Sequence, residues 1–197
     1  MAYHGYIPFV KQFISRLKHP RILEVGLDKG ITTIPLLSFM SPRYESYEFV
    51  GVDVFLREEL KLTIAYLDRM QTHSIDLIQE NSLTFLPKLV VAERKFDVIL
   101  LDGDHNYYTV QKEISCIDSL LDERGIIIVD DYHGRWSEKD MWYAEKDEYA
   151  SNSDVTKRVN TEKQGVKCAV DEFLSSHPSW QLTVLLQGEP VILSRII

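Results

Sequence analysis

The sequence has few cysteines, no long apolar run and no cluster of basic residues. Its two cysteines, Cys116 and Cys168, stand far apart and lack the spacing of metal ligands. Such sparse cysteine usage fits a reducing cytoplasm, so we expect a cytoplasmic protein without disulfides. No segment approaches the roughly 20 apolar residues that span a bilayer, and residues 1–10 lack the pattern of a signal peptide. We therefore expect no membrane association.

Positive charge is also scarce relative to negative charge. The chain carries 22 Lys and Arg against 30 Asp and Glu, a net charge of −8. Because no run of basic residues could follow a phosphate backbone, nucleic acid is not expected as a partner. The 197 residues, 45% of them hydrophobic, are enough for the core of one domain spanning 1–197. The balance suits an acidic enzyme that acts on a small molecule.

Short apolar runs alternate along the chain with segments of helical periodicity. This alternation predicts an α/β fold with a parallel sheet covered on both faces. Near the end, two apolar runs lie a tight turn apart, at Gly188 and Glu189, and predict an antiparallel hairpin. The expected strands are 21–25, 49–52, 75–78, 96–101, 125–129, 182–186 and 191–196, and the expected helices are 7–17, 32–39, 58–70, 83–91, 108–121 and 166–174.

The segment at about 134–164 does not follow this alternation. It is polar and charged, yet it contains several aromatic residues, among them Trp136, Trp142 and Tyr143. Loops of this length in compact domains are usually lids, binding loops or disordered segments, and plain linkers contain few aromatics. We therefore expect a lid-like insert. Its aromatic side chains either contact an apolar or sugar-bearing substrate or pack the lid onto the core.

A glycine-containing turn follows the first predicted strand. The motif Glu24-Val25-Gly26-Leu27-Asp28-Lys29-Gly30 lets the backbone turn sharply and approach a ligand. Asp53 ends the second strand, where a carboxylate can accept hydrogen bonds from both hydroxyls of a ribose. Together these features predict an adenosine-containing ligand, although a glycine-tolerant connection without a ligand would also explain the turn. Asp28 stands where a dinucleotide fingerprint would have its second glycine, which argues against a nicotinamide-dependent oxidoreductase.

Two further strands end in carboxylates. Asp102, Asp104 and His105 follow the run at 96–101, and the pair Asp130 and Asp131 follows the run at 125–129. The carboxyl ends of parallel strands meet at one edge of a sheet, where several negative charges are costly without a cation or a cationic ligand. One aspartate of the pair could instead cap the following segment, but that would leave the other carboxylates unexplained.

The motif Glu24-x-Gly26-x-x-x-Gly30-x-Thr32, with Asp53 and the closing hairpin, resembles class I S-adenosylmethionine-dependent methyltransferases. The motifs at 101–107 and 129–132 are similar to those of the small-molecule O-methyltransferases of the macrocin and cephalosporin-tailoring group. The resemblance covers about 22–197 and leaves the insert unexplained. It implies a Rossmann-like three-layer sandwich whose mainly parallel, seven-stranded sheet has the order 3-2-1-4-5-7-6, with strand 7 antiparallel.

The resemblance also implies roles for individual residues. Glu24 would lie near the methionine part of the cofactor, with Gly26 and Gly30 beneath it, and Asp53 would bind the ribose. Asn81 or Ser82 would approach the adenine. The implied cofactor-binding residues are Glu24, Gly26, Gly30, Thr32, Asp53, Asn81, Ser82 and Asp102, and the implied ligands of Mg²⁺ are Asp102, Asp130 and Asp131.

The roles of three other residues near the carboxylates follow from their chemistry. His105 could remove the proton of an acceptor hydroxyl, or it could be a structural residue, and His133 is a second candidate base. Asp104 is expected to cap the helix that begins near Tyr107.

The expected function is therefore methyl transfer from S-adenosylmethionine to a hydroxyl of a small molecule, assisted by Mg²⁺, with Asp102 and His105 as catalytic residues. A non-catalytic or regulatory nucleotide-binding module is the alternative. The sequence does not identify the acceptor, and the first helix or the insert could pair two subunits into a homodimer.

Overall fold

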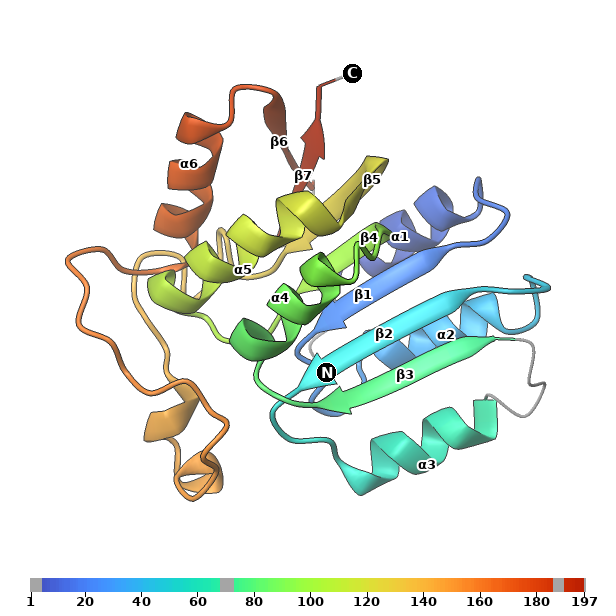
Figure 1. Cartoon of the computed structure of the whole chain (residues 1–197), viewed down its shortest axis with the longest axis horizontal. Helices are drawn as coiled ribbons and strands as arrows, with labels where there is room; N and C mark the ends of the chain where they lie inside the picture. The colour runs from blue at the N-terminus through green and yellow to red at the C-terminus, as the bar shows by residue number, and fades with distance from the viewer. Residues whose placement is uncertain (1–4, 68–72, 186–189, 197) are drawn as a thin grey trace.

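The computed structural model describes residues 5–67, 73–185 and 190–196, and these form one seven-stranded sheet with helices on both sides (Figure 1). The strand order is β3-β2-β1-β4-β5-β7-β6. Strands β1 to β5 pair in parallel, and β7 is antiparallel to both β5 and β6, so the predicted topology is confirmed. The strands are β1 Arg21–Val25, β2 Glu48–Asp53, β3 Ser74–Gln79, β4 Phe96–Leu101, β5 Leu121–Val129, β6 Trp180–Val184 and β7 Val191–Arg195.

The helices divide between the two faces of the sheet. One apolar cluster joins the sheet to α4, α5 and α6, and the other joins it to α1, α2 and α3. Figure 1 shows the first group in front of the sheet and α1 and α2 behind it. Their bounds are α1 Ile7–Ile14, α2 Thr33–Met40, α3 Glu58–Leu67, α4 Ser82–Val91, α5 Tyr107–Leu120 and α6 Val166–Ser176.

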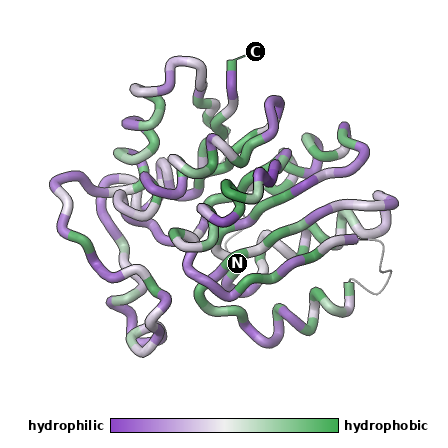
Figure 2. Tube along the Cα trace, viewed as in Figure 1, coloured by the Kyte–Doolittle hydropathy of each residue, from purple (hydrophilic) through white to green (hydrophobic). Residues whose placement is uncertain are grey.

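Strand β4 shows why the central strands read as continuous apolar runs. Its side chains alternate between the faces, so Val98 and Leu100 belong to one cluster while Ile99 and Leu101 belong to the other. Because both faces are covered, every one of these positions excludes water and is apolar. The edge strand β3 instead mixes exposed and half-buried residues. Figure 2 shows a further contrast: hydrophobic residues, in green, run through the core, whereas the insert is mostly hydrophilic or neutral, in purple and white.

The observed boundaries differ from the predicted ones mainly at element ends. Helix α1 ends at Ile14 rather than at residue 17, and β6 begins at Trp180, two residues before the predicted start. Trp180 is itself buried and packs on Phe173 of α6, so tertiary packing extends the strand beyond its apolar alternation. The predicted turn at Gly188 and Glu189 lies outside the described residues, as does the predicted end of α3.

The insert at 134–164 contains two short 3₁₀ helices, η2 Tyr143–Glu145 and η3 Asp147–Tyr149. Figure 1 shows it leaving β5 and returning to α6 past the ends of the strands. Cys116 and Cys168 are free thiols. Within the described part of the chain, no helix combines the length and the apolar character that crossing a membrane requires.

The central position of β4 generates a stability prediction. Replacing the fully buried Ile99 with alanine should lower the free energy of unfolding by about 2 to 5 kcal/mol, because the core loses apolar contacts and keeps a cavity. Leu62 on α3 is 70% exposed, so Leu62→Ala is the matched control and should change stability little. Urea denaturation followed by circular dichroism measures both. Equal effects of the two substitutions would contradict the assignment of β4 to the core.

Candidate functional site

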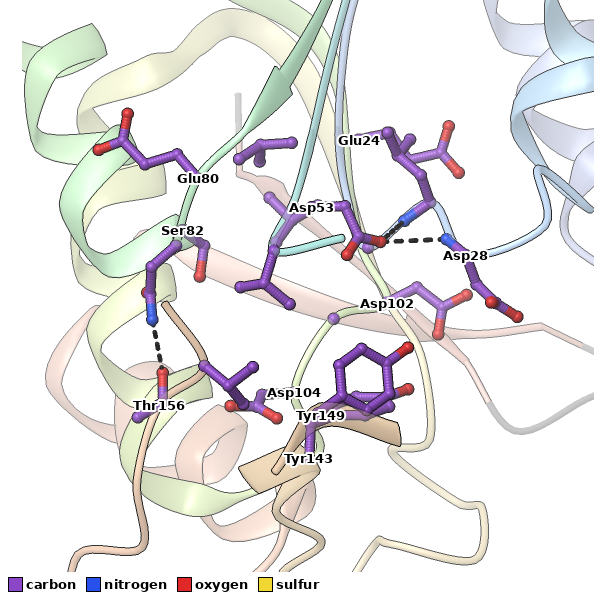
Figure 3. Close-up of a pocket in the computed structure, with 18 of the residues that line it drawn as sticks. Glu24, Asp28, Asp53, Glu80, Ser82, Asp102, Asp104, Tyr143, Tyr149 and Thr156 are labelled. Carbon is purple, nitrogen blue, oxygen red and sulfur yellow. Dashed lines mark hydrogen bonds between the residues drawn. The ribbon is translucent and has the colours of Figure 1, made fainter. Parts of the chain in front are cut away.

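A cavity opens at the carboxyl ends of β1 to β4, where the parallel strands deliver their following loops to one edge of the sheet (Figure 3). The insert closes another side of this cavity. The lining residues are Glu24, Val25, Gly26, Leu27, Asp28, Lys29, Ile31, Thr32, Val52, Asp53, Val54, Glu80, Asn81, Ser82, Asp102, Gly103, Asp104, Tyr143, Tyr149, Val155 and Thr156. Of the predicted cofactor-binding residues, all except Gly30 line it.

Glu24 lies near the end of β1 and is 2% exposed. Burial raises the pKa of its carboxyl to about 8, although a hydrogen bond from the Thr33 hydroxyl opposes that shift. The Thr33 Oγ1 donates to Glu24 Oε2 at 2.9 Å. The sequence motif pointed to the neighbouring Thr32, whose hydroxyl lies 3.1 Å from the Tyr6 hydroxyl and which does line the cavity. Thr33 is thus a supporting residue that the motif missed.

Asp53 fixes the loop that follows β1. Its Oδ2 accepts the backbone N–H groups of Leu27 at 2.7 Å and Asp28 at 3.1 Å, and its Oδ1 accepts that of Phe55 at 2.9 Å. Figure 3 shows the carboxylate between this loop and the cavity. Each carboxylate oxygen has two lone-pair sites, so Asp53 can hold the loop and still accept hydroxyl protons from a ligand.

The two glycines of the motif act differently. Gly26 has φ +87°, and a Cβ there would overlap the backbone carbonyl of Asp102, so glycine permits β1 and β4 to bring their loops together. Gly30 has φ +74° and packs against Leu60 of α3, away from the cavity lining. Gly26 therefore shapes the cavity directly, and Gly30 supports the turn from outside.

Asn81 and Ser82 follow β3, as expected for residues that reach the adenine side of the site. Asn81 caps α4 by accepting the Leu83 N–H at 2.8 Å. Ser82 Oγ donates to Glu113 Oε1 at 2.6 Å, and Glu113 is a buried residue of α5. Burial raises the pKa of Glu113 to about 8, with an opposing effect of the Ser82 hydrogen bond. A second buried carboxyl therefore stands behind this wall of the cavity.

Asp102 and Asp130 come together where β4 and β5 end. Burial raises the pKa of Asp102 well above its usual value, and the adjacent charge of Asp130 and the hydrogen bond between the two carboxyls add to the effect. The cluster predicted from the sequence therefore exists as a close carboxyl pair.

Asp131 adds its charge to the causes that raise the pKa of Asp102, and it also contacts His105. Its backbone has φ +57°, a left-handed conformation, and its Oδ2 lies 3.2 Å from the Nδ1 of His105. His105 is 9% exposed, and burial lowers its pKa to about 4, partly opposed by Asp130. The other ring nitrogen, Nε2, lies 3.9 Å from Asp102 Oδ1. The histidine is therefore uncharged near neutral pH and sits between the two strand ends. His133, the other candidate base, is exposed and packs edge-on against Tyr132.

The prediction that Asp104 caps α5 is wrong. The helix begins at Tyr107, and its N-cap is Asn106, whose side chain accepts the Thr109 N–H at 2.8 Å. Asp104 instead lines the cavity, where its Oδ2 accepts the Thr109 hydroxyl at 3.3 Å and its buried Oδ1 has no hydrogen-bond partner. Burial raises the pKa of Asp104 to about 6. A capping residue stands directly before the first helical turn, and Asp104 is two residues too early.

The insert supplies lining residues that the sequence did not identify as cofactor contacts. The Tyr143 and Tyr149 rings lie 5.0 Å apart at an interplanar angle of 70° and face the cavity together with Thr156 (Figure 3). The sequence feature that pointed to these two tyrosines was the high aromatic content of the insert. Trp142 is only 2% exposed and lies near Tyr108 of α5, so this aromatic residue packs the insert onto the core.

The lining is strongly acidic. Lys29 is the single basic side chain among the described lining residues, against six carboxyls: Glu24, Asp28, Asp53, Glu80, Asp102 and Asp104. Three of the six have raised pKa values, which is the response of carboxyls that are crowded and buried without a counter-ion. The cavity therefore favours a positively charged ligand.

The predicted metal ligands lie near each other without forming a ready-made metal centre. Within residues 5–67, 73–185 and 190–196, no three His, Cys, Asp or Glu side chains are arranged so that they could hold a metal ion. The Asp102 and Asp130 pair supplies the oxygen donors that Mg²⁺ prefers, whereas Asp131 faces His105.

Comparisons with known proteins agree with this fold. A family model described as "Methyltransferase domain" matches residues 23–132, and no curated protein sequence matches significantly. An O-methyltransferase from Bacillus cereus, solved with S-adenosylhomocysteine, aligns with a TM-score of 0.62 at 16% identity, covering 98% of this chain and 82% of that one.

Two further similar structures were solved with bound groups. The O-methyltransferase TomG from Streptomyces achromogenes, in complex with S-adenosylmethionine, has a TM-score of 0.63 at 15% identity and coverage of 99% and 81%. The MycE methyltransferase of mycinamycin biosynthesis, in complex with Mg and S-adenosylhomocysteine, has a TM-score of 0.61 at 15% identity, with coverage of 99% of this chain and 50% of MycE.

The buried carboxyl of Glu113 generates a pH prediction. Glu113 keeps its proton in the native state up to about pH 8, whereas the unfolded chain releases it above about pH 4.5. Its contribution to stability is therefore complete at low pH and is lost as the pH rises through this window. Glu113→Gln cannot ionise, so its stability relative to wild type should increase by up to about 1.4 kcal/mol per pH unit between about pH 5 and 8.

Urea unfolding across this pH range measures the difference, and Glu123→Gln at an exposed position of β5 is the matched control. A constant difference between Glu113→Gln and wild type at every pH would contradict the protonated state of Glu113.

Proposed function

Because the chain belongs to the methyltransferase domain family and has the class I methyltransferase fold, we propose that it transfers a methyl group from S-adenosylmethionine to a hydroxyl of a small molecule, with assistance from Mg²⁺. The observation that carries the proposal is the acidic cavity at the ends of β1 to β4. Its position is where open α/β sheets bind ligands, at the carboxyl ends of the strands.

The residues present fit S-adenosylmethionine. This cofactor combines a ribose and an adenine with a methionine part that carries two positive charges, at the sulfonium and the amino group, and one carboxylate. Asp53 would accept the ribose hydroxyls, and Asn81 and Ser82 would adjoin the adenine, since they follow β3 at the same edge. Glu24 and Asp102 would lie toward the cationic part, where positive charge would stabilise their ionised forms. When bound, the cofactor supplies a methyl group activated by the sulfonium charge.

His105 is the residue best placed to accept the proton of the acceptor hydroxyl. Its Nδ1 lies against the Asp131 carboxylate, which favours a proton on Nδ1 and leaves Nε2 as the acceptor beside Asp102. Asp131 thereby orients the ring and would stabilise the imidazolium that forms. The low pKa of His105 makes it a weak base, so proton removal needs an acceptor hydroxyl of lowered pKa.

Magnesium would meet that need. Asp102 and Asp130 would hold it, with Asp131 as the third ligand suggested by the resemblance, and its charge would offset the repulsion that raises the pKa of Asp102. When bound, the metal supplies positive charge that lowers the pKa of the acceptor hydroxyl. The Mg-containing complex of MycE, a fold neighbour, supports this part of the proposal.

The acceptor is proposed as a small molecule on the basis of site geometry. The cavity lies beside Asp102 and the insert, and its acidic lining suits neither nucleic acid nor an anionic membrane surface. A homodimer and a cytoplasmic location stay predictions from the sequence.

The ribose contact can be tested by binding alone. Asp53→Asn should weaken the binding of S-adenosylhomocysteine about 10- to 100-fold, because hydrogen bonds to a charged acceptor contribute roughly 1.5 to 3 kcal/mol. Isothermal titration calorimetry measures the affinity, and Asp76→Asn at an exposed position of β3 controls for the change in net charge. Equal affinities of the two variants would place the ribose elsewhere.

The role of the metal can be tested by chelation and by titration with Mg²⁺ alone. We expect wild type to bind Mg²⁺ in calorimetry, Asp130→Asn to show no detectable binding, and methyl transfer in an acceptor panel to stop in excess chelator. Full turnover in chelator would exclude metal assistance. Cofactor binding without transfer to any acceptor would instead favour a regulatory module.

A further inference from the structure

The insert is attached to the cofactor side of the cavity by polar contacts that reach three separate places on the sheet edge. Asn152 Nδ2 donates to the Val54 carbonyl after β2 at 3.0 Å. The side chain of Asn81, after β3, donates to the Asp154 carbonyl at 2.6 Å and to the Thr156 hydroxyl at 3.0 Å. The ends of β2 and β3 therefore both hold the same stretch of the insert.

Arg57 adds a link between the insert and the loop after β1. Its Nε donates to Asp28 Oδ1 at 2.6 Å, and its NH2 group donates to Glu148 Oε1 at 2.9 Å. Asp28 belongs to the loop that Asp53 fixes, while Glu148 lies in η3 directly before Tyr149. One guanidinium thus connects the glycine loop to the helix that carries an aromatic lining residue.

These contacts position Tyr143 and Tyr149 against the cavity. Tyr149 is 9% exposed, and the pair packs edge to face. Burial raises the pKa of Tyr143, and the nearby negative charge of Asp102 adds to the effect, so both the ring and a neutral hydroxyl stand close to the acidic lining. Figure 3 shows the two rings across the cavity from Asp53 and Glu24. An electron-rich aromatic wall beside carboxylates is suited to a cationic ligand that also carries a flat base.

We infer that the insert completes the cofactor site: Tyr143 and Tyr149 form its outer wall and contact the bound cofactor, while Arg57, Asn81 and Asn152 hold that wall in place. The inference rests on the proposed function. The attachments of residues 148–156 are to the glycine loop and to the segments after β2 and β3, on the side of Asp53. Residues 140 and 141 of the insert instead contact the segment after β4, where the Met141 N–H donates to the His105 carbonyl at 2.9 Å and Asp140 accepts the Tyr107 N–H at 2.8 Å. The part of the insert at 143–156 therefore encloses the cofactor, and entry of the cofactor requires the wall to loosen.

Calorimetry with S-adenosylhomocysteine tests the wall. Tyr149→Ala should weaken binding by about tenfold, since it removes an aromatic contact and its partner's packing. Tyr149→Phe retains the ring and should stay within about threefold of wild type. The melting temperature of each unliganded variant, measured in parallel, separates a lost contact from a lost fold.

The attachment has its own test with a matched control. Glu148→Gln weakens the link to Arg57 and should lower the affinity for S-adenosylhomocysteine by about two- to fivefold, the range expected for a partly exposed ion pair. Glu145→Gln removes the same charge from an ion pair with Arg158 that lies wholly within the insert, and it should leave the affinity unchanged. Neither residue lines the cavity.

Limited proteolysis supplies a readout that does not depend on affinity. In wild type, saturating S-adenosylhomocysteine should slow tryptic cleavage after the exposed Lys157 at least about threefold, because the bound ligand stabilises the closed wall. Protection should be smaller in Glu148→Gln than in Glu145→Gln. The inference would be overturned if wild type and Tyr149→Ala bound S-adenosylhomocysteine with equal affinity and the ligand did not slow tryptic cleavage of wild type. That result would leave the proposed function intact. Failure of wild type to bind would overturn both.

Discussion

The parallel pairing of β1 to β5 is the constraint on which the site depends, because it brings the carboxyl ends of these strands to one edge of the sheet. Whatever side chains follow these strands must share a small volume. In this chain most of them are acidic, so the fold concentrates negative charge at that edge. Like charges at close range in a partly buried place are costly, and each carboxyl must find a proton, a donor or a cation.

The individual carboxyls meet that requirement in different ways. Asp53 accepts three backbone N–H groups and so becomes the organiser of the loop after β1. Glu24 and Glu113 are buried and hold protons up to about pH 8, each with one hydroxyl donor. Burial raises the pKa of Asp102 well above its usual value, and the charge of Asp130 and the hydrogen bond between the two carboxyls add to the effect. The carboxyl that accepts backbone N–H groups fixes the structure of the site. For the carboxyls that lack such donors, a cationic ligand would change the protonation state.

Short-range patterns in the sequence were sufficient for the strands and helices, whereas the strand order and most of the cavity residues were implied by the resemblance to class I methyltransferases. Strand periodicity placed β1 and β4, and glycine chemistry placed Gly26 where only a residue without Cβ fits. The contacts of the insert could not be predicted in this way. Asn81 meets Thr156 across 75 positions through side-chain hydrogen bonds that leave no periodic trace. The choice between Asp104 and Asn106 as the cap depended on the exact first residue of α5, which sequence patterns define least well.

The adjacent residues Asp130 and Asp131 show how backbone geometry divides one motif into two functions. In an extended strand, neighbouring side chains point to opposite faces, but Asp131 has left the strand and adopts φ +57°, which aspartate tolerates better than most residues. Asp130 therefore hydrogen-bonds to Asp102 while Asp131 contacts His105, although the charge of Asp131 also raises the pKa of Asp102 and that of Asp130 also raises the pKa of His105. The sequence suggests that these two aspartates are equivalent ligands. In the structure, Asp130 pairs with the Asp102 carboxyl and Asp131 contacts the His105 ring. The contact with His105 gives Asp131 a role in orienting the base in addition to its proposed role as the third metal ligand.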